Sequence, residues 1–308
     1  MDERRLWGIV LAGGEGSRLA ETTQRIYGSR LPKQFLSFGQ NRTFLQATVD
    51  RLQGVIPPER TVVIVPQHHE GLAREQLSGF QGIEVVAQPR NAGTGPGVLL
   101  PLVHVLKRDA KADVALVPSD HDFRAPEVMR QALRKAKEVV DTTKSRMVLL
   151  GARAESPASD LGRIIPRRPR RDTGVRTIQR FVEKPPPALA DVLFRQGALW
   201  NTMLSVARGE ALWHLARRHL PQQTALFAGY AAVLGTPAAP SFLEHLYAGL
   251  TTADFSRDLV AASGGLSVAS MTGAGWCDCG TPERLAAALG HEASAARPQG
   301  SAVAEVCD

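Results

Sequence analysis

A glycine-rich segment near the N-terminus carries the first residues whose types and spacing suggest chemistry. It runs Leu11-Ala12-Gly13-Gly14-Glu15-Gly16-Ser17-Arg18 and directly follows the apolar, strand-like run 6–11. Glycines let backbone N–H groups approach a ligand without interference from Cβ atoms, and N–H groups at the end of a strand suit an anion such as phosphate. Arg18 and the later Lys33 supply two cations. We therefore expect Arg18 and Lys33 to bind a nucleoside triphosphate.

Two aspartates suit a divalent cation. Asp120 follows the buried strand predicted at 113–117 and precedes His121, and Asp278 lies in the segment 277–279. Mg²⁺ prefers one or two protein carboxylates together with phosphate oxygens, so both aspartates are candidate ligands. An aspartate after a strand is also a common cap or turn former, and that interpretation stays open for each. His121 alone fits a structural role better than that of a ligand.

A lysine in the second half is a further candidate. The triplet Glu183-Lys184-Pro185 ends a strand-like run, and its lysine could reach a sugar phosphate as a point charge. Taken alone, such a pair is more often a surface ion pair. The glycine-rich loop is not a P-loop, since no Gly-Lys-Ser/Thr follows it. It is also an incomplete dinucleotide-binding fingerprint, since Leu19 stands three residues after Gly16.

Strand-like apolar runs alternate with amphipathic helices in the first half of the chain. The predicted elements are strands at 6–11, 61–66, 83–89, 113–117 and 147–151 and helices at 94–109 and 126–140. This alternation predicts an α/β fold with a mostly parallel central sheet and helices on both faces. Ligands bind at the carboxyl ends of such strands, where the loops 13–18, 88–94 and 119–122 should converge.

In the second half of the chain, predicted strands and helices no longer alternate regularly. Its predicted elements are strands at 163–166, 175–184, 199–201 and 266–270 and helices at 185–196, 210–219, over much of 222–250 and from 281 onward. Thr281 followed by proline is typical of a helix N-terminus. The Ala/Gly/Pro/Ser-rich tail from Ala293 is expected to be loose.

Length and composition limit the class of protein to which this chain can belong. The chain has 308 residues, 44% of them hydrophobic, which suffices for one large α/β core or a core with a modest second lobe. It contains no apolar run of about 18 residues and no signal-peptide pattern, so we expect a cytoplasmic protein with no membrane partner. Its three cysteines form no disulfide framework, and the spacing at 277–279 does not suit zinc.

The net charge of +7 raises the question of an anionic partner. The cations are spread along the chain, with one dense cluster at Arg167–Arg171 that carries no interleaved aromatic residues. We interpret this cluster as a solvated loop and expect no nucleic-acid partner, with an anionic polymer or a membrane surface as the alternative.

Several motifs, in order, resemble those of a known family. The glycine-rich loop together with Pro32-Lys33-Gln34-Phe35-Leu36 is similar to the signature of sugar-phosphate nucleotidyltransferases. Four segments resemble, more narrowly, mannose-1-phosphate guanylyltransferases: Gln88-Pro89-Arg90-Asn91-Ala92-Gly93-Thr94, Pro118-Ser119-Asp120-His121, Phe181-Val182-Glu183-Lys184-Pro185 and Gly197-Ala198-Leu199-Trp200-Asn201. The resemblance extends from about Leu6 to Leu289.

The resemblance implies a Rossmann-like nucleotidyltransferase fold of the GT-A-like type, with a small, β-rich sugar-binding lobe. Residues 1–152 would form the nucleotide-binding part and 153–292 the sugar-binding and C-terminal part of one domain, followed by a flexible tail at 293–308. The implied reaction is Mg²⁺-dependent. A sugar 1-phosphate, with mannose 1-phosphate as the main candidate, attacks the α-phosphorus of a nucleoside triphosphate, with GTP as the main candidate, and gives GDP-mannose and pyrophosphate.

The same resemblance implies a role for each motif. Arg18, Lys33 and Asp120 would be catalytic, and Asp120 and Asp278 would hold Mg²⁺. The nucleotide-binding residues would be Leu11, Ala12, Gly13, Gly14, Gly16, Ser17, Arg18, Lys33, Gln88, Asn91, Gly93 and Thr94. The residues contacting the sugar and its phosphate would be Gly162, Glu183, Lys184 and Asn201.

The sequence departs from the family pattern at two places. Residues 23–29 look like an insertion between Arg18 and Lys33, and the bulk of Met203, which stands where the family has glycine, could reshape the sugar pocket. Two alternatives stay open: a cytidylyltransferase of the isoprenoid-precursor type, and a catalytically silent nucleotide-sugar-binding or nucleic-acid-binding protein. The oligomeric state is also open, with a homodimer as one option.

Overall fold

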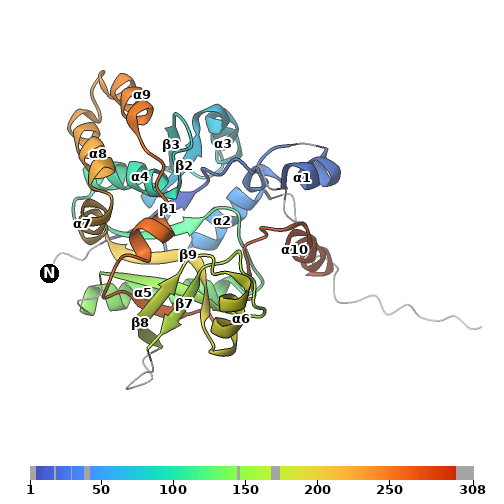
Figure 1. Cartoon of the computed structure of the whole chain (residues 1–308). Helices are drawn as coiled ribbons and strands as arrows, with labels where there is room; N and C mark the ends of the chain where they lie inside the picture. Colours follow the sequence, from blue (N-terminus) through green and yellow to red (C-terminus); the bar gives the residue numbers. More distant parts are fainter. Residues whose placement is uncertain are drawn as a thin grey trace, which may run out of the picture.

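The computed structural model describes residues 5–16, 19–28, 30–37, 42–143, 146–167 and 174–295, with the backbone alone for 291–295. A nine-stranded sheet crosses the molecule, and helices cover both of its faces (Figure 1). The strands are β1 (Leu6–Leu11), β2 (Thr61–Pro66), β3 (Glu84–Gln88), β4 (Asp113–Pro118), β5 (Asp122–Phe123), β6 (Met147–Arg153), β7 (Arg163–Pro166), β8 (Val175–Val182), β9 (Leu199–Arg208), β10 (Ser267–Ser270) and β11 (Trp276–Cys277). Their order in the sheet is β3-β2-β1-β4-β9-β6-β10-β8-β7, and β5 and β11 pair separately.

The helices were largely expected from periodicity. The α-helices are α1 (Ala20–Tyr27), α2 (Phe44–Leu52), α3 (Glu70–Gln76), α4 (Thr94–Arg108), α5 (Pro126–Thr142), α6 (Pro187–Arg195), α7 (Gly209–His219), α8 (Pro221–Val233), α9 (Ala239–Gly249) and α10 (Pro282–Ala295). Shorter turns are the 3₁₀ segments η2 (Lys33–Phe35), η3 (Pro58–Arg60) and η4 (Gln67–His69) and the π-helix η5 (Phe255–Val260). Within the described chain, no helix combines the length and the apolar character needed to cross a bilayer.

Two of these helices correct the sequence predictions. The segment 23–29, which looked like an insertion and for which no helix was predicted, lies mostly in α1, which ends at Tyr27 and is followed by Gly28 in a left-handed conformation. The C-terminal helix α10 continues to Ala295, whereas the tail was expected to begin at Ala293.

The strands of the first half pair in parallel, as predicted. β1 lies between β2 and β4, and β2 continues to β3, all in parallel register. Because successive strand residues face opposite sides, Ile9 belongs to one hydrophobic core and Val10 to the other. Helices α4, α7 and α8 supply the first core, and α2 and α5 supply the second. The α/β architecture with helices on both faces is therefore confirmed.

The expectation of a mostly parallel sheet does not hold beyond β4. There β9 pairs antiparallel with β4, β6 and β7, and β8 pairs antiparallel with β7 and β10, so among the described strands of this part only β6 and β10 pair in parallel. The extra pairing of β7 with β9 closes β9, β6, β10, β8 and β7 into a ring. Parallel neighbours need a long crossover, whereas β7 and β8 are separated by a short connection and pair antiparallel.

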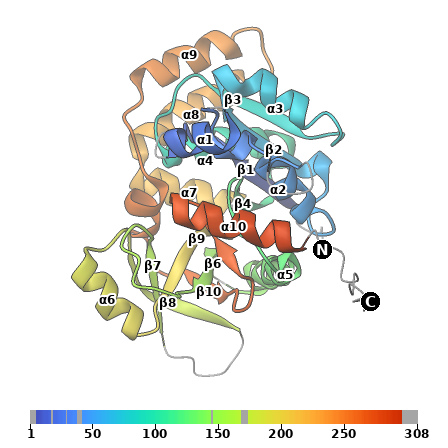
Figure 2. The ribbon, with the colours of Figure 1, turned by 90° about the vertical axis from the view of Figure 1, so that its right-hand side faces the viewer.

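The C-terminal segment returns to the first half of the molecule. β11 pairs with β5, and α10 then packs its Leu285 and Ala288 against Leu19 and Phe44 in a small separate core. Figure 2 shows α10 crossing the face of the molecule close to α1 and α2. This return places residues 277–280 at the edge where β1 and β4 end.

Candidate active site

The glycine-rich loop that follows β1 is fixed by a residue downstream in the chain. Gln34 is buried, and its Nε2 donates hydrogen bonds to the carbonyl oxygens of Ala12 (3.1 Å) and Gly14 (2.8 Å). The Ala12 N–H donates to the Ile64 carbonyl of β2. The sequence predicted no separate role for Gln34, which is part of the motif around Lys33. In the structure, the Gln34 side chain fixes the glycine-rich loop through these two hydrogen bonds.

A pocket of about 350 Å³ opens beside this loop, where β1, β3 and β4 end. We call it the nucleotide pocket, after the ligand that the sequence predicts for it. The residues predicted to bind a nucleotide that line it are Leu11, Gly13, Gly14, Gln88, Asn91, Gly93 and Thr94, and Asp120 lines it as well. The three loops expected to converge at this edge of the sheet therefore do so.

Gln88 and Gly13 contact each other at the wall of the nucleotide pocket. Gln88 Nε2 donates to the Gly13 carbonyl at 3.4 Å, and a Cβ atom at Gly13 would lie 2.8 Å from that nitrogen, so a side chain there would displace Gln88. The Gln88 Oε1 atom is buried and lacks a hydrogen-bond partner among the described residues. A buried acceptor of this kind suits a donor group on a ligand, such as an amino group of a base.

Asp254 lines the same pocket and was not predicted from the sequence. Its side chain accepts a hydrogen bond from the Arg257 N–H and so caps η5. Thr94 Oγ1 accepts from the Phe255 N–H at 2.8 Å and lies 3.5 Å from Asp254 Oδ2, which ties the start of α4 to η5. No apolar periodicity marks this π-helical segment, so the sequence gives no signal for Asp254.

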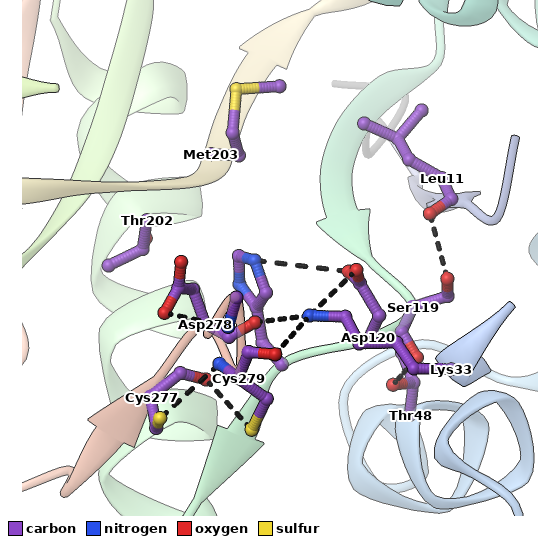
Figure 3. A network of polar contacts seen from close by, with 12 residues as sticks. Leu11, Lys33, Thr48, Ser119, Asp120, Thr202, Met203, Cys277, Asp278 and Cys279 are labelled. Carbon is purple, nitrogen blue, oxygen red and sulfur yellow. Dashed lines mark hydrogen bonds and ion pairs between the residues drawn. The ribbon is translucent and has the colours of Figure 1, made fainter. Parts of the chain in front are cut away.

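Asp120 and Asp278 lie at the same end of the two-stranded sheet formed by β5 and β11 (Figure 3). Asp122 pairs with Cys277 in that sheet, so the residues just before β5 and just after β11 are neighbours. Asp120 lines the nucleotide pocket, and Asp278 lines an adjoining pocket. The two predicted metal ligands thus come together although most of the second half of the chain separates them.

Lys33 connects the segments of both aspartates (Figure 3). Its Nζ lies 3.1 Å from Asp120 Oδ2 and donates hydrogen bonds to the backbone carbonyls of Asp278 and Cys279. Burial alone would raise the pKa of Asp120, but the nearby Lys33 ammonium acts in the opposite direction and the net shift lowers that pKa. The Asp120 carboxylate is therefore ionised at neutral pH, as a metal ligand must be.

His121 supports this arrangement as a neutral side chain. Burial is the main cause that lowers the pKa of His121, to about 4. Its Nδ1 accepts a hydrogen bond from Trp276 Nε1 at 3.1 Å, and its Nε2 lies 3.9 Å from Asp120 Oδ1. The neutral ring therefore carries its proton on Nε2, facing Asp120.

The adjoining pocket, of about 210 Å³, collects the residues predicted to contact a sugar phosphate. We call it the sugar pocket, after the ligand that the sequence predicts for it. Its lining includes Gly162, Glu183, Lys184 and Asn201, together with Asp278. Four residues line both pockets, which are therefore adjacent: Thr94, His121, Met203 and Asp254.

Glu183 is held in the sugar pocket against a glycine. A Cβ atom at Gly162 would lie 2.7 Å from Glu183 Oε2, so only glycine leaves room for this carboxylate. Oε2 is buried and lacks a hydrogen-bond partner among the described residues, while Oε1 lies 3.8 Å from Lys184 Nζ. Burial is the main cause that raises the pKa of Glu183. A buried acceptor lining a pocket of this size suits a sugar hydroxyl.

A bulge in β9 directs Met203 toward both pockets. Between the pairs Leu149–Ser205 and Gly151–Asn201 the register shifts, and Met203 adopts a left-handed backbone with φ of 61°. The Asn201 side chain accepts a hydrogen bond from the Met203 N–H at 3.2 Å and stabilises this turn. Bulges often re-aim a side chain in this way beside active sites.

Other predicted residues lie outside the pocket walls. Ala12 is buried under the loop, and Gly16 has φ of +66° and approaches Pro32 so closely that a Cβ atom would lie 2.7 Å from its Cα. Ser17, Arg18 and most of the basic cluster at 167–171 lie outside the described residues.

The family model for nucleotidyl transferases matches residues 7–294 of the chain. This match covers the sheet, both pockets and the segment that returns through β11. The chain belongs to the nucleotidyl transferase family.

Within that family, the chain is similar to two curated bacterial proteins, one of which is named for mannose 1-phosphate. It is 26% identical over 232 residues to mannose-1-phosphate guanylyltransferase 2 of Escherichia coli O157:H7, a match that covers 72% of this chain and 47% of the relative. It is 28% identical over 220 residues to the alginate biosynthesis protein AlgA of Pseudomonas aeruginosa, covering 68% and 43%. The chain thus spans about half the length of the curated relatives it matches.

The chain is also similar to a solved structure. The structure described as mannose-1-phosphate geranyltransferase from Thermus thermophilus matches with a TM-score of 0.78 and 30% identity, covering 90% of this chain and 76% of that one.

Proposed function

We propose that this protein transfers a guanylyl group from GTP to mannose 1-phosphate, which gives GDP-mannose and pyrophosphate. The observation that carries the proposal is the pair of adjacent pockets with one aspartate in each: Asp120 in the nucleotide pocket and Asp278 in the sugar pocket. A reaction that joins two phosphorylated substrates needs two such sites side by side. The names of the relatives support guanylyl transfer and mannose 1-phosphate as the particular case.

Asp120 and Asp278 are the residues that would hold Mg²⁺. Each already has a basic partner, since Lys33 lies beside Asp120 and Arg284 Nε lies 3.0 Å from Asp278 Oδ1. The donor set of two carboxylates beside a phosphate site fits a hard divalent cation. A bound Mg²⁺ would offset the negative charge that develops on the reacting phosphates.

The chain's own residues would align the substrates. Gln88 and the loop backbone at Gly13 and Gly14 would contact the nucleotide, and Arg18 and Lys33 would supply positive charge toward the triphosphate. Glu183 would accept hydrogen bonds from hydroxyl groups of the sugar, and Lys184 would contact the phosphate of the sugar phosphate. The sugar phosphate oxygen then bonds to the α-phosphorus while the α–β phosphoanhydride bond breaks, and pyrophosphate leaves. Alignment and fixed positive charge are what such a transfer requires of a protein.

The experiment is a matrix of substrates read by pyrophosphate release. Purified protein with MgCl₂ is offered GTP, ATP, CTP, UTP and dTTP, each with mannose 1-phosphate, glucose 1-phosphate or an alcohol phosphate. We expect the highest kcat/KM for GTP with mannose 1-phosphate. A preference for CTP with an alcohol phosphate would replace the proposal with a cytidylyltransferase, and absence of release with every pair would refute catalysis.

A further inference from the structure

Three metal-binding side chains meet beside the glycine-rich loop, away from Asp120 and Asp278. Glu15, His68 and His69 each offer one ligand atom, and these atoms all lie within 4.8 Å of one another. Glu15 belongs to the loop after β1, and the two histidines belong to η4, directly after β2. None of the three has a role in the proposed reaction.

The spacing of two of these groups matches a tetrahedral metal site. His68 Nε2 lies 3.3 Å from Glu15 Oε2. Zinc binds imidazole nitrogen and carboxylate oxygen at about 2.0–2.2 Å, so two ligands of a tetrahedral ion lie about 3.3 Å apart. A neutral hydrogen bond between the same atoms would be shorter in most cases, near 2.9 Å.

The third group is held in place by packing. The His69 ring lies 4.1 Å from the His68 ring and 5.1 Å from the Phe35 ring, between centroids. Its Nδ1 is buried and lacks a hydrogen-bond partner among the described residues. An ion pair between Glu15 and His68 would account for two of the groups, but it does not account for a second imidazole packed at the same point, tilted by 50° to the first.

We propose that Glu15, His68 and His69 bind one divalent transition metal ion of the zinc type. Two imidazoles and one carboxylate suit Zn²⁺, Co²⁺ or Ni²⁺ and disfavour Mg²⁺, which prefers an all-oxygen set. Three protein ligands leave the fourth position to water. Since Glu15 follows Gly14 of the nucleotide pocket, the ion would tie the glycine-rich loop to η4.

The test is calorimetric titration of the untagged full-length protein with ZnCl₂ in the presence of millimolar MgCl₂. Mg²⁺ competes for oxygen-ligand sites, so the heat that remains reports the transition-metal site. We expect one Zn²⁺ per chain, and we expect Glu15→Gln, His68→Ala and His69→Ala each to weaken binding by at least about tenfold. The control His245→Ala removes an exposed histidine of α9 and should bind as the parent does. Equal binding by all four variants would overturn the proposal.

A second measurement identifies the ligands directly and does not depend on turnover. X-ray absorption at the zinc edge should show imidazole scattering and nitrogen or oxygen ligands near 2.0 Å. A sulfur shell near 2.3 Å would assign the ion to Cys277 and Cys279 instead and refute the site. Because neither experiment uses GTP or a sugar phosphate, failure of this proposal and failure of the proposed function are distinguishable.

Discussion

Lys33 Nζ lies 3.1 Å from Asp120 Oδ2, and the same ammonium donates to the backbone carbonyls of Asp278 and Cys279. One largely buried cation therefore joins the carboxylate of one candidate metal ligand to the backbone of the other. The contact links η2 in the first part of the chain to the segment after β11. Charge balance and local structure at the site depend on this one side chain.

Replacing Lys33 by methionine should cost stability as well as activity. Lys33→Met keeps the length of the side chain but leaves two carbonyls and a carboxylate without their donor, which should cost about 1–3 kcal/mol of unfolding free energy. Urea unfolding at pH 7 measures the loss. Lys135→Met is the control, because Lys135 forms an exposed ion pair with Glu138 and its removal should change stability by less than about 0.5 kcal/mol. Equal stability of the two variants would contradict this role of Lys33.

Both aspartates should be required for metal-dependent turnover. Asp120→Asn and Asp278→Asn keep the side-chain volume and remove the charge that a divalent cation needs, so kcat/KM should fall by at least about a hundredfold. Chelation of Mg²⁺ by EDTA should abolish turnover of the parent, and added MgCl₂ should restore it. Asp191→Asn, which alters a surface ion pair with Arg195, serves as the control. Full activity of either site variant would remove that aspartate from the metal site.

Glu183→Gln should stabilise the protein while weakening the sugar site. Burial raises the pKa of Glu183 above its unfolded value, so the folded protein holds this proton more tightly than the unfolded chain. The stability contributed by that proton is present below the unfolded pKa and is lost as pH rises through the folded pKa. Glutamine stays neutral, so the variant should match the stability of the parent near pH 4 and be more stable than the parent at pH 8.

The same variant should raise the KM for the sugar 1-phosphate with little change in the KM for the nucleotide. Thermal or urea unfolding across pH 4–8 gives the stability difference, and initial rates give the KM values. A stability difference that stays constant over this range would show that Glu183 does not titrate with a raised pKa.

Gly162→Ala tests the room left for the Glu183 carboxylate. The added Cβ would lie 2.7 Å from Glu183 Oε2 and 3.2 Å from Asn201 Cβ, so the wall of the sugar pocket must shift. We expect KM for the sugar 1-phosphate to rise by about tenfold, the result of losing about 1.4 kcal/mol of binding. Gly264→Ala is the matched control, because a Cβ there meets no atom within 4 Å. Unchanged KM in Gly162→Ala would exclude this contact from the sugar site.

Two substitutions at Met203 separate the contribution of its side chain to stability from that of its backbone conformation. Met203→Gly and Met203→Ala both remove the side chain between the two pockets, but only glycine adopts φ near 61° without strain. The glycine variant should therefore be more stable than the alanine variant by about 1 kcal/mol, measured by urea unfolding. Equal stability would mean that the left-handed turn relaxes once the methionine is gone.

Local patterns predicted the parts of the fold that depend on local residues. The apolar runs at β1, β2 and β4 and the amphipathic period of α5 are properties of neighbouring residues, and each element occurs where it was expected. The closed ring around β9 depends on which distant strands meet, and no local pattern encodes that choice. The bulge at Met203 and the π-helix η5 arise from the same tertiary packing.

The candidate site likewise contains residues that local motifs predicted and residues that they did not. Gln88, Asp120 and Glu183 were predicted from their motifs, and they line the two pockets. Asp254 enters the site through a segment without periodicity, and Gln34 acts through hydrogen bonds to a loop that precedes it in the chain. Neither role could be predicted, because no local sequence pattern indicates it.

The pairing of β5 with β11 also sets an order of assembly. Asp122 and Cys277, which pair there, are separated by about half of the chain, so forming this contact closes a very long loop and is slow relative to the more local pairing of β1 with β2. During synthesis, the glycine-rich loop after β1 emerges from the ribosome long before Asp278 does. A growing chain therefore holds the glycine-rich loop and Asp120 before Asp278 is added, and the two aspartates become neighbours only when β11 pairs with β5 and α10 packs against Leu19 and Phe44.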